Sequence, residues 1–336
     1  MRNFSLTVAS ALALAGCEAL SYYKQAVRGQ LDLMHSARPV ADLLADPATA
    51  PRLREELAAA AAIRDFASRE LKLPDNASYR RYADLQRPYA VWNVIAAPEF
   101  SLRPAESCFP VAGCVAYRGF FSEPAAQEFA GKLRAKGDDV YVAGVPAYST
   151  LGWFDDPLLS TFIDFPEVEL ARLLFHELAH QRLYVKGDSA FSESFAVTVE
   201  REGLRRWLKD DARAPQRRAF ESMEERTREF TRLMDAARLE LESLYRQSLA
   251  ADEMRRRKRE ILAALQARGR TLPGYERLFE REPTNALLAA FATYTQYVPA
   301  FERMLREANG DLEVFYARAK ELSETERPLR EKALNN

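Results

Sequence analysis

Leu173-Leu174-Phe175-His176-Glu177-Leu178-Ala179-His180-Gln181 is the stretch of sequence that most constrains the fold. Its apolar residues recur at helical spacing, so it predicts a helix with a buried face. His176 and His180 lie one turn apart on such a helix and point the same way, as two imidazoles that bind one metal ion must. Glu177 lies roughly 60° around the axis from His180. We therefore expect Glu177 to accept a proton from a metal-bound water and not to bind the metal.

A catalytic Zn²⁺ needs a third protein ligand and an open position. The chain has three histidines, and the third, His35, is distant in sequence, so a histidine ligand is excluded unless His35 reaches the site. We expect a carboxylate instead, and Glu193 on the next predicted helix has the nearest suitable placement. Glu200 is the alternative, and Glu202 and Asp188 are weaker candidates.

Charge on a tetrahedral intermediate needs stabilisation. In the gluzincin metallopeptidases, which the His-Glu-x-x-His pattern resembles, a tyrosine or a histidine commonly supplies it, and this resemblance implies a tyrosine here because no further histidine is at hand. Tyr294 and Tyr297 lie in an otherwise apolar predicted helix, and either phenol can point into the site or pack in the core. Tyr184, one turn after His180, is another candidate. Residues 147–156 are rich in aromatic residues and precede the histidine helix, so we expect them to line a cleft where a substrate adds to a sheet edge.

Binding of a substrate amino terminus requires acidic groups near the metal. Asp155, Asp156 and Glu106 are available, but nothing in the sequence places them. The choice between exopeptidase and endopeptidase therefore stays open.

Strands and helices are predicted before the histidine helix, and almost only helices from residue 166 onward. Segments rich in β-branched and aromatic residues predict strands over 89–96, 114–121, 139–145 and 161–165. Helical spacing of apolar residues predicts helices over 20–35, 51–71, 123–136, 166–184, 188–208, 285–307 and 311–322. Two long charged helices, 214–249 and 251–268, are expected to form a hairpin. We expect an α+β, mainly α fold in one unit over 18–336, with a small sheet in 18–165 and a helical part in 166–336 that includes the hairpin 214–268.

Residues 1–17 have the features of a secretory signal. An apolar run over 4–15 follows Arg2 and is too short to span a bilayer. Leu14-Ala15-Gly16-Cys17 matches a lipobox, in which the cysteine is lipidated, and an ordinary cleaved signal is the alternative. Glu18 stands where inner-membrane lipoproteins carry Asp. We therefore expect an envelope protein anchored through Cys17 in the outer membrane and facing the periplasm.

The charge and the other cysteines agree with this compartment. The net charge of −1 gives no reason to expect a nucleic-acid partner. With Cys17 acylated, Cys108 and Cys114 remain, six positions apart. An oxidising compartment favours a disulfide between them over two buried thiols.

The pattern His-Glu-x-x-His, followed by Glu193 and Ala196 on the next predicted helix, resembles the gluzincin metallopeptidases. The whole chain also resembles a bacterial family of putative aminopeptidases, which are zinc-dependent outer-membrane lipoproteins. The matching stretches are the lipobox, 108–121, 148–157, 176–196 and 285–302. The resemblance implies a zincin-like fold, Zn²⁺ bound by His176, His180 and Glu193, and Glu177 as the general base.

These features predict a zinc metallopeptidase of the bacterial envelope that hydrolyses peptides or proteins, with aminopeptidase activity as one form. Two alternatives remain. One is a non-catalytic, zinc-containing lipoprotein that acts as a scaffold, with a protein partner at the hairpin 214–268. The other is a hydrolase that cleaves the stem peptides of peptidoglycan.

Overall fold

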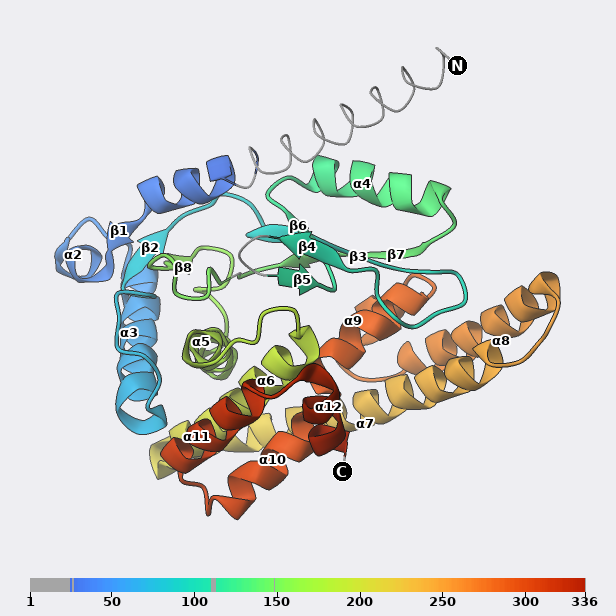
Figure 1. Ribbon diagram of the computed structural model, residues 1–336. Coiled ribbons are helices and arrows are strands. Elements are labelled where there is room, and N and C mark those ends of the chain that lie inside the picture. The colour runs from blue at the N-terminus through green and yellow to red at the C-terminus, as the bar shows by residue number, and fades with distance from the viewer. Residues whose placement is uncertain (1–24, 26, 110–112, 148, 336) are drawn as a thin grey trace, which may run out of the picture.

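The computed structural model describes residues 25, 27–109, 113–147 and 149–335. Cys17 and the predicted signal lie outside the described residues, and the predicted helix over 20–35 is described only from residue 25, with helix up to residue 36. The prediction of a mainly helical α+β fold is confirmed, since short strands form three small sheets and helices account for most of the remainder (Figure 1).

The largest sheet lies between α4 (Glu123–Ala135) above it and α9 (Asn285–Thr295) below it (Figure 1). Its antiparallel strands are β3 (Val91–Ala97), β6 (Arg118–Phe120) and β7 (Asp139–Val145), in the order β6-β3-β7. Alternate side chains of a strand point to opposite faces. Trp92 and its neighbours on one face pack against α4, which leaves the other face turned toward the site.

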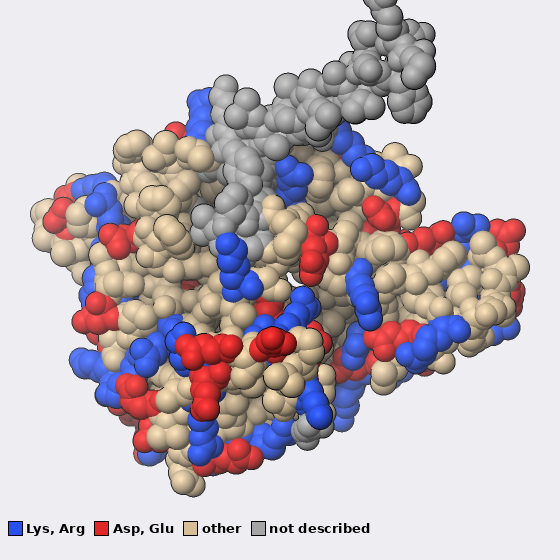
Figure 2. Space-filling view, viewed as in Figure 1, with Lys and Arg blue, Asp and Glu red and all other residues tan. Residues whose placement is uncertain are grey.

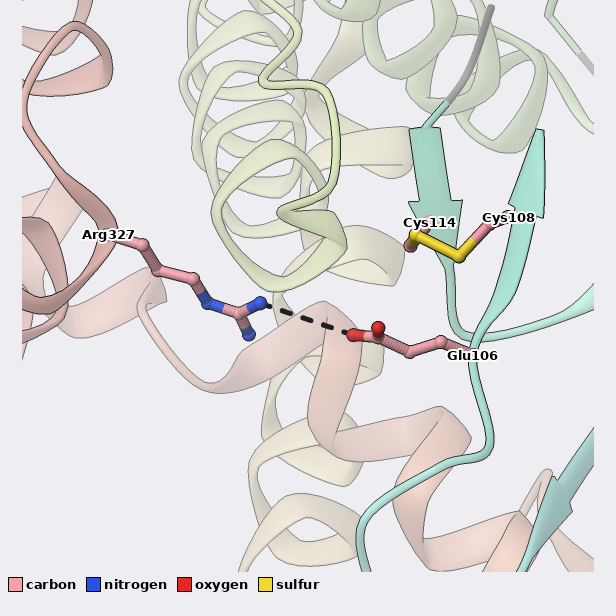
Figure 3. The surroundings of a disulfide bond; sticks show 4 residues. All are labelled: Glu106, Cys108, Cys114 and Arg327. Carbon is pink, nitrogen blue, oxygen red and sulfur yellow. Dashed lines mark ion pairs between the residues drawn. A yellow bond between two sulfur atoms is a disulfide. The ribbon is translucent and has the colours of Figure 1, made fainter. Parts of the chain in front are cut away.

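Two smaller sheets complete the strands. One consists of β1 (Arg38–Pro39), β2 (Arg81–Ala83) and β8 (Leu158–Leu159), and the other of β4 (Ser107–Phe109) and β5 (Gly113–Val115). β4 and β5 form an antiparallel hairpin in which Cys108 and Cys114 are directly opposite and joined by a disulfide (Figure 3).

Two strand predictions need correction. Residues 161–165 form turns and not a strand, because the backbone N–H groups of Phe162 and Ile163 donate to the carbonyl of Leu159. The single strand predicted over 114–121 is divided into β5 and β6. The division arises because Val115 pairs with Ser107 in the disulfide hairpin, whereas residues from Arg118 onward pair with β3.

Two adjacent helices form the centre of the molecule, α5 (Glu167–Arg182) and α6 (Ser189–Trp207), with α3 (Pro51–Leu71) beside them. A Cβ atom at Gly203 of α6 would lie 2.6 Å from the ring of Phe175 and 2.8 Å from Leu71. Only glycine therefore allows the three helices to approach so closely.

The predicted helical hairpin is formed by α7 (Ala214–Tyr245) and α8 (Ala251–Gly269), which extend from the body (Figure 1). On the face shown in Figure 2, basic and acidic side chains are interspersed over it. Lys258 of α8 donates to Asp139 at the start of β7 at 2.7 Å, so the hairpin is attached to the sheet. The remaining helices are α2 (Val40–Ala45), η1 (Asp211–Arg213), η2 (Glu276–Phe279), α9 (Asn285–Thr295), α10 (Val298–Glu307), α11 (Leu312–Ser323) and α12 (Arg327–Asn335).

The helix predicted over 285–307 is broken into α9 and α10. Pro299 lies in the first turn of α10, where a residue without an N–H is tolerated, but in a continuous helix it would remove a hydrogen bond and clash with the preceding turn. The backbone N–H of Tyr297 donates instead to the hydroxyl of Ser194 on α6 at 3.1 Å. The break therefore joins the C-terminal helices to the centre of the molecule.

The start of α6 is held by two contacts of Asp188. Its side chain accepts a hydrogen bond from the backbone N–H of Phe191, which caps the helix. It also forms a buried ion pair with Arg330 of α12 at 2.9 Å. Among the described residues, no helix has the length and apolar character needed to cross a membrane.

Candidate functional site

The described structure brings three predicted ligands together at the junction of α5 and α6. Nε2 of His176 and Nε2 of His180 are 3.1 Å apart. Oε2 of Glu193 lies 3.2 Å from the first and 3.4 Å from the second. All three side chains are nearly buried, with 7–12% of each exposed. One nitrogen from each histidine and one carboxylate oxygen thus converge on a single point.

These atoms fit a metal ion in chemistry as well as in position. Nδ1 of His176 carries its proton toward Glu200, so its Nε2 presents a lone pair to the carboxylate of Glu193. Electron-donating atoms so close need a cation or a proton between them. Without a metal, a proton on His176 takes this place. Burial lowers the pKa of His176, but the hydrogen bonds to Glu193 and Glu200 outweigh burial and raise it well above its usual value. Burial would raise the pKa of Glu193, but the charge of His180 and the bonds to both histidines lower it to about 2.

Glu200 lies one to two turns after Glu193 on α6, and it contacts the other side of His176. Its Oε2 accepts from Nδ1 of His176 at 2.8 Å. The structure therefore separates the two candidates for third ligand: Glu193 faces the Nε2 atoms, and Glu200 orients a histidine, as carboxylates commonly do behind metal ligands.

The weaker candidates are engaged elsewhere. Glu202 forms ion pairs with Arg205 and Arg206 at 2.6 and 2.7 Å. Asp188 caps α6, as described above, and His35 is exposed on the N-terminal helix and is not a member of the ligand cluster.

Glu177 faces a cavity of about 500 Å³ that is also lined by His176, His180 and Glu193. Burial raises the pKa of the Glu177 carboxyl, while the charges of His176 and His180 lower it. A carboxyl group beside the converging side chains, with a raised pKa, is suited to accept and return a proton.

The cavity lies between α5 and the sheet. Val91 and Asn93 of β3 and Val145 of β7 face it, because they alternate with the residues that pack on α4. On another side it is lined by the loop residues Ala147, Ser149, Thr150, Leu151 and Phe154, which agrees with the prediction for this loop. The N-terminal helix contributes Val27, Gln30 and Leu31.

Asp156 holds this loop in place. Its carboxylate accepts hydrogen bonds from the backbone N–H and hydroxyl of Thr150 at 2.9 and 2.8 Å, and from the hydroxyl of Ser149 at 3.3 Å. Only 3% of Asp156 is exposed. Burial raises its pKa to about 6, although the bonds from Thr150 act in the opposite direction.

A comparison with family models matches residues 21–334 to a family described as "Putative aminopeptidase". The chain belongs to this family. The description of this family suggests peptidase activity. No match was found among curated proteins or among solved structures.

The three candidate tyrosines lie in different places relative to the cavity. Tyr294 of α9 lines the cavity, and its ring is stacked on that of His176 at 6.3 Å between centroids. The charge of Glu193 raises the Tyr294 pKa well above its usual value although 40% of the residue is exposed, so the phenol keeps its proton near neutral pH. Tyr297 is 3% exposed and packs in the main core, outside the residues that line the cavity. Tyr184 also lines the cavity, with its ring 6.2 Å from that of His180.

Sequence reasoning did not identify the residues that contact the cavity from the sheet. Asn93, Gly119 and Tyr117 come from strands or their ends. The alternation in the strand predicted over 89–96 places Val91 and Asn93 on one face, but it does not tell which face meets the histidine helix. That information comes from the packing of α4 on the opposite face.

Proposed function

We propose that the protein is a zinc-dependent peptidase. The observation that carries this proposal is the convergence of His176, His180 and Glu193 in a cavity that Glu177 also faces. Two imidazoles and one carboxylate form a donor set that suits catalytic Zn²⁺ and leaves a position open. The HExxH spacing adds a carboxylate beside the metal, which hydrolysis requires.

The side chains have separable roles in this reaction. Zn²⁺ bound there would supply Lewis acidity, which activates water and polarises the substrate carbonyl. Glu177 accepts the proton of the attacking water and delivers it to the departing amine. Tyr294, whose phenol stays protonated, donates a hydrogen bond to the oxygen that becomes negative. Glu200 keeps the proton of His176 on Nδ1, so that Nε2 is free to bind.

We further propose that the enzyme works in the bacterial envelope, anchored through Cys17. The lipobox at residues 14–17 supports this location. The disulfide between Cys108 and Cys114 is a second support, because such bonds persist in oxidising compartments.

Glu177→Gln in the full-length protein tests the proposal. We expect the variant to bind as much zinc as the wild type and to lose peptide hydrolysis, because the amide cannot accept the proton of water. Glu169→Gln is the matched control, since Glu169 lies in the first turn of the same helix and outside the cavity. It should keep both zinc and activity. Undiminished hydrolysis by Glu177→Gln would overturn the mechanism, and zinc binding without hydrolysis of any peptide by the wild type would favour the scaffold alternative.

A further inference from the structure

The cavity at the metal site is bounded mainly by apolar side chains. Aliphatic and aromatic residues come from the sheet, the loop before α5 and the N-terminal helix, and they include Leu31, Val91, Val115, Val145, Leu151 and Phe154. Its volume of about 500 Å³ is within the usual range of ligand pockets. Such a surface favours large apolar side chains of a substrate over charged ones.

The described residues that line the cavity include no Lys or Arg, and their only carboxylates are Glu177 and Glu193. Glu193 is directed at both histidines, and Glu177 is assigned to proton transfer. The described lining therefore supplies no further acid that could pair with the ammonium group of a substrate amino terminus.

The three acids that sequence reasoning offered for this purpose lie outside the lining. Asp156 is buried and occupied by Ser149 and Thr150. Asp155 is exposed on the loop. Glu106 precedes the disulfide hairpin and points toward Arg327 of α12, with 4.0 Å between their charged atoms (Figure 3).

The sheet offers a place for the backbone of a substrate. β7 is an edge of its sheet in the described structure, and Val145 at its end and Ala147 beyond it line the cavity. An extended peptide can add to such an edge through backbone hydrogen bonds. These bonds recognise a chain that continues in both directions and do not require a terminus.

We propose that the substrate is an internal stretch of polypeptide with a large apolar side chain beside the bond to be cleaved. This inference rests on the proposed peptidase function. A charged amino terminus in the cavity would lose hydration without gaining a free opposite charge, which is costly, whereas the backbone of an internal segment brings only neutral groups. The enzyme is accordingly an endopeptidase.

Two peptides of identical sequence test this directly, one with a free amino terminus and one N-acetylated, each with Leu or Phe near its centre. The full-length zinc-loaded protein should cleave both internally, with values of kcat/KM within about threefold, because the terminus lies outside the recognised segment. Release of single N-terminal residues from the free peptide, with the acetylated one cleaved at least about 100-fold less efficiently, would overturn the inference and leave the peptidase proposal standing. Cleavage of neither peptide would overturn the proposed function, and the inference with it.

Val145→Asp tests the role of the apolar wall. Val145 is partly exposed to the cavity, so an aspartate there can be hydrated without unfolding the sheet. We expect kcat/KM for the Leu and Phe peptides to fall at least about tenfold while bound zinc is unchanged. Val314→Asp, at an exposed position on α11, is the matched control and should change neither. Equal kcat/KM for Val145→Asp and wild type would overturn the assignment of this wall to substrate binding.

Discussion

Nδ1 of His176 and Oε2 of Glu200 lie 2.8 Å apart across the interface of α5 and α6. This hydrogen bond connects the two helices that supply the ligand atoms. It determines which nitrogen of His176 carries the proton, and it holds the ring plane so that Nε2 faces Glu193. The proposed metal site is therefore oriented by packing between helices as well as by the spacing of its histidines.

Glu200→Ala should weaken zinc binding about 10-fold to 100-fold, because His176 loses both its orientation and the charge that strengthens it as a ligand. Competition with a chelator of known affinity measures this. Glu202→Ala is the matched control, since Glu202 is a buried carboxylate on the same helix that pairs with arginines. It should leave zinc affinity unchanged. Equal losses in the two variants would show that the effect comes from general damage to α6.

Tyr294→Phe should lower kcat about 100-fold with little change in KM, because its phenol acts on charge that develops only in the transition state. Steady-state kinetics on protein with confirmed zinc content provides the measurement. Tyr297→Phe serves as the comparison, since this residue packs in the core away from the cavity. Similar kcat values for wild type and Tyr294→Phe would exclude the role assigned to Tyr294.

The cluster of His176, His180 and Glu193 was predictable from sequence because most of it is local. His176 and His180 share one helix face, and a carboxylate early on the next helix returns to the same point when the two helices pack antiparallel. The role of Glu200 was not predictable, since it depends on how α6 is rotated against α5. Nothing in the sequence distinguishes a carboxylate that binds metal from one that binds the far side of a histidine.

Errors in the predicted elements have similar causes. The segment 161–165 has the composition of a strand, but Thr161 donates to the carbonyl of Pro146 and the backbone turns back toward Leu159. The helix 285–307 has continuous apolar spacing, yet it ends where Tyr297 bonds to Ser194 of another helix. In the first segment a contact distant in sequence overrides a local preference, and in the second such a contact adds to the break that Pro299 imposes.

Arg330→Ala should destabilise the protein by about 3 kcal/mol, because it leaves Asp188 buried without its partner. Urea unfolding measures the loss. Arg327→Ala is the control, since Arg327 lies on the same helix but is half exposed, and exposed pairs contribute only about 0–1 kcal/mol. Zinc binding should also weaken in Arg330→Ala, because Asp188 caps the helix that carries Glu193. A loss no greater than that of Arg327→Ala would contradict the importance of this pair.

Because of Asp156, we expect the free energy of unfolding to fall as pH rises from about 4 to about 6. Its pKa is raised to about 6 in the folded protein by burial, whereas an unfolded chain has an aspartate pKa of about 3.9. Between these values the folded state holds a proton that the unfolded state has released, so the free energy of unfolding falls with increasing pH. The two pKa values differ by about 2, which corresponds to a loss of up to about 3 kcal/mol by pH 7.

Asp156→Asn removes this titration, so the difference in free energy of unfolding between wild type and variant isolates it from every other group. Urea unfolding at pH values of about 4, 6 and 7.5 should show the wild type losing stability relative to Asp156→Asn as pH rises. Asp155→Asn, at the exposed neighbouring position, should follow the wild type at every pH. The opposite result, in which the wild type gains stability relative to Asp156→Asn as pH rises, would contradict this prediction. It would mean that the hydrogen bonds from Thr150 and Ser149 outweigh burial and favour the charged carboxylate. The sign of the difference therefore decides which of the two effects governs the loop beside the cavity.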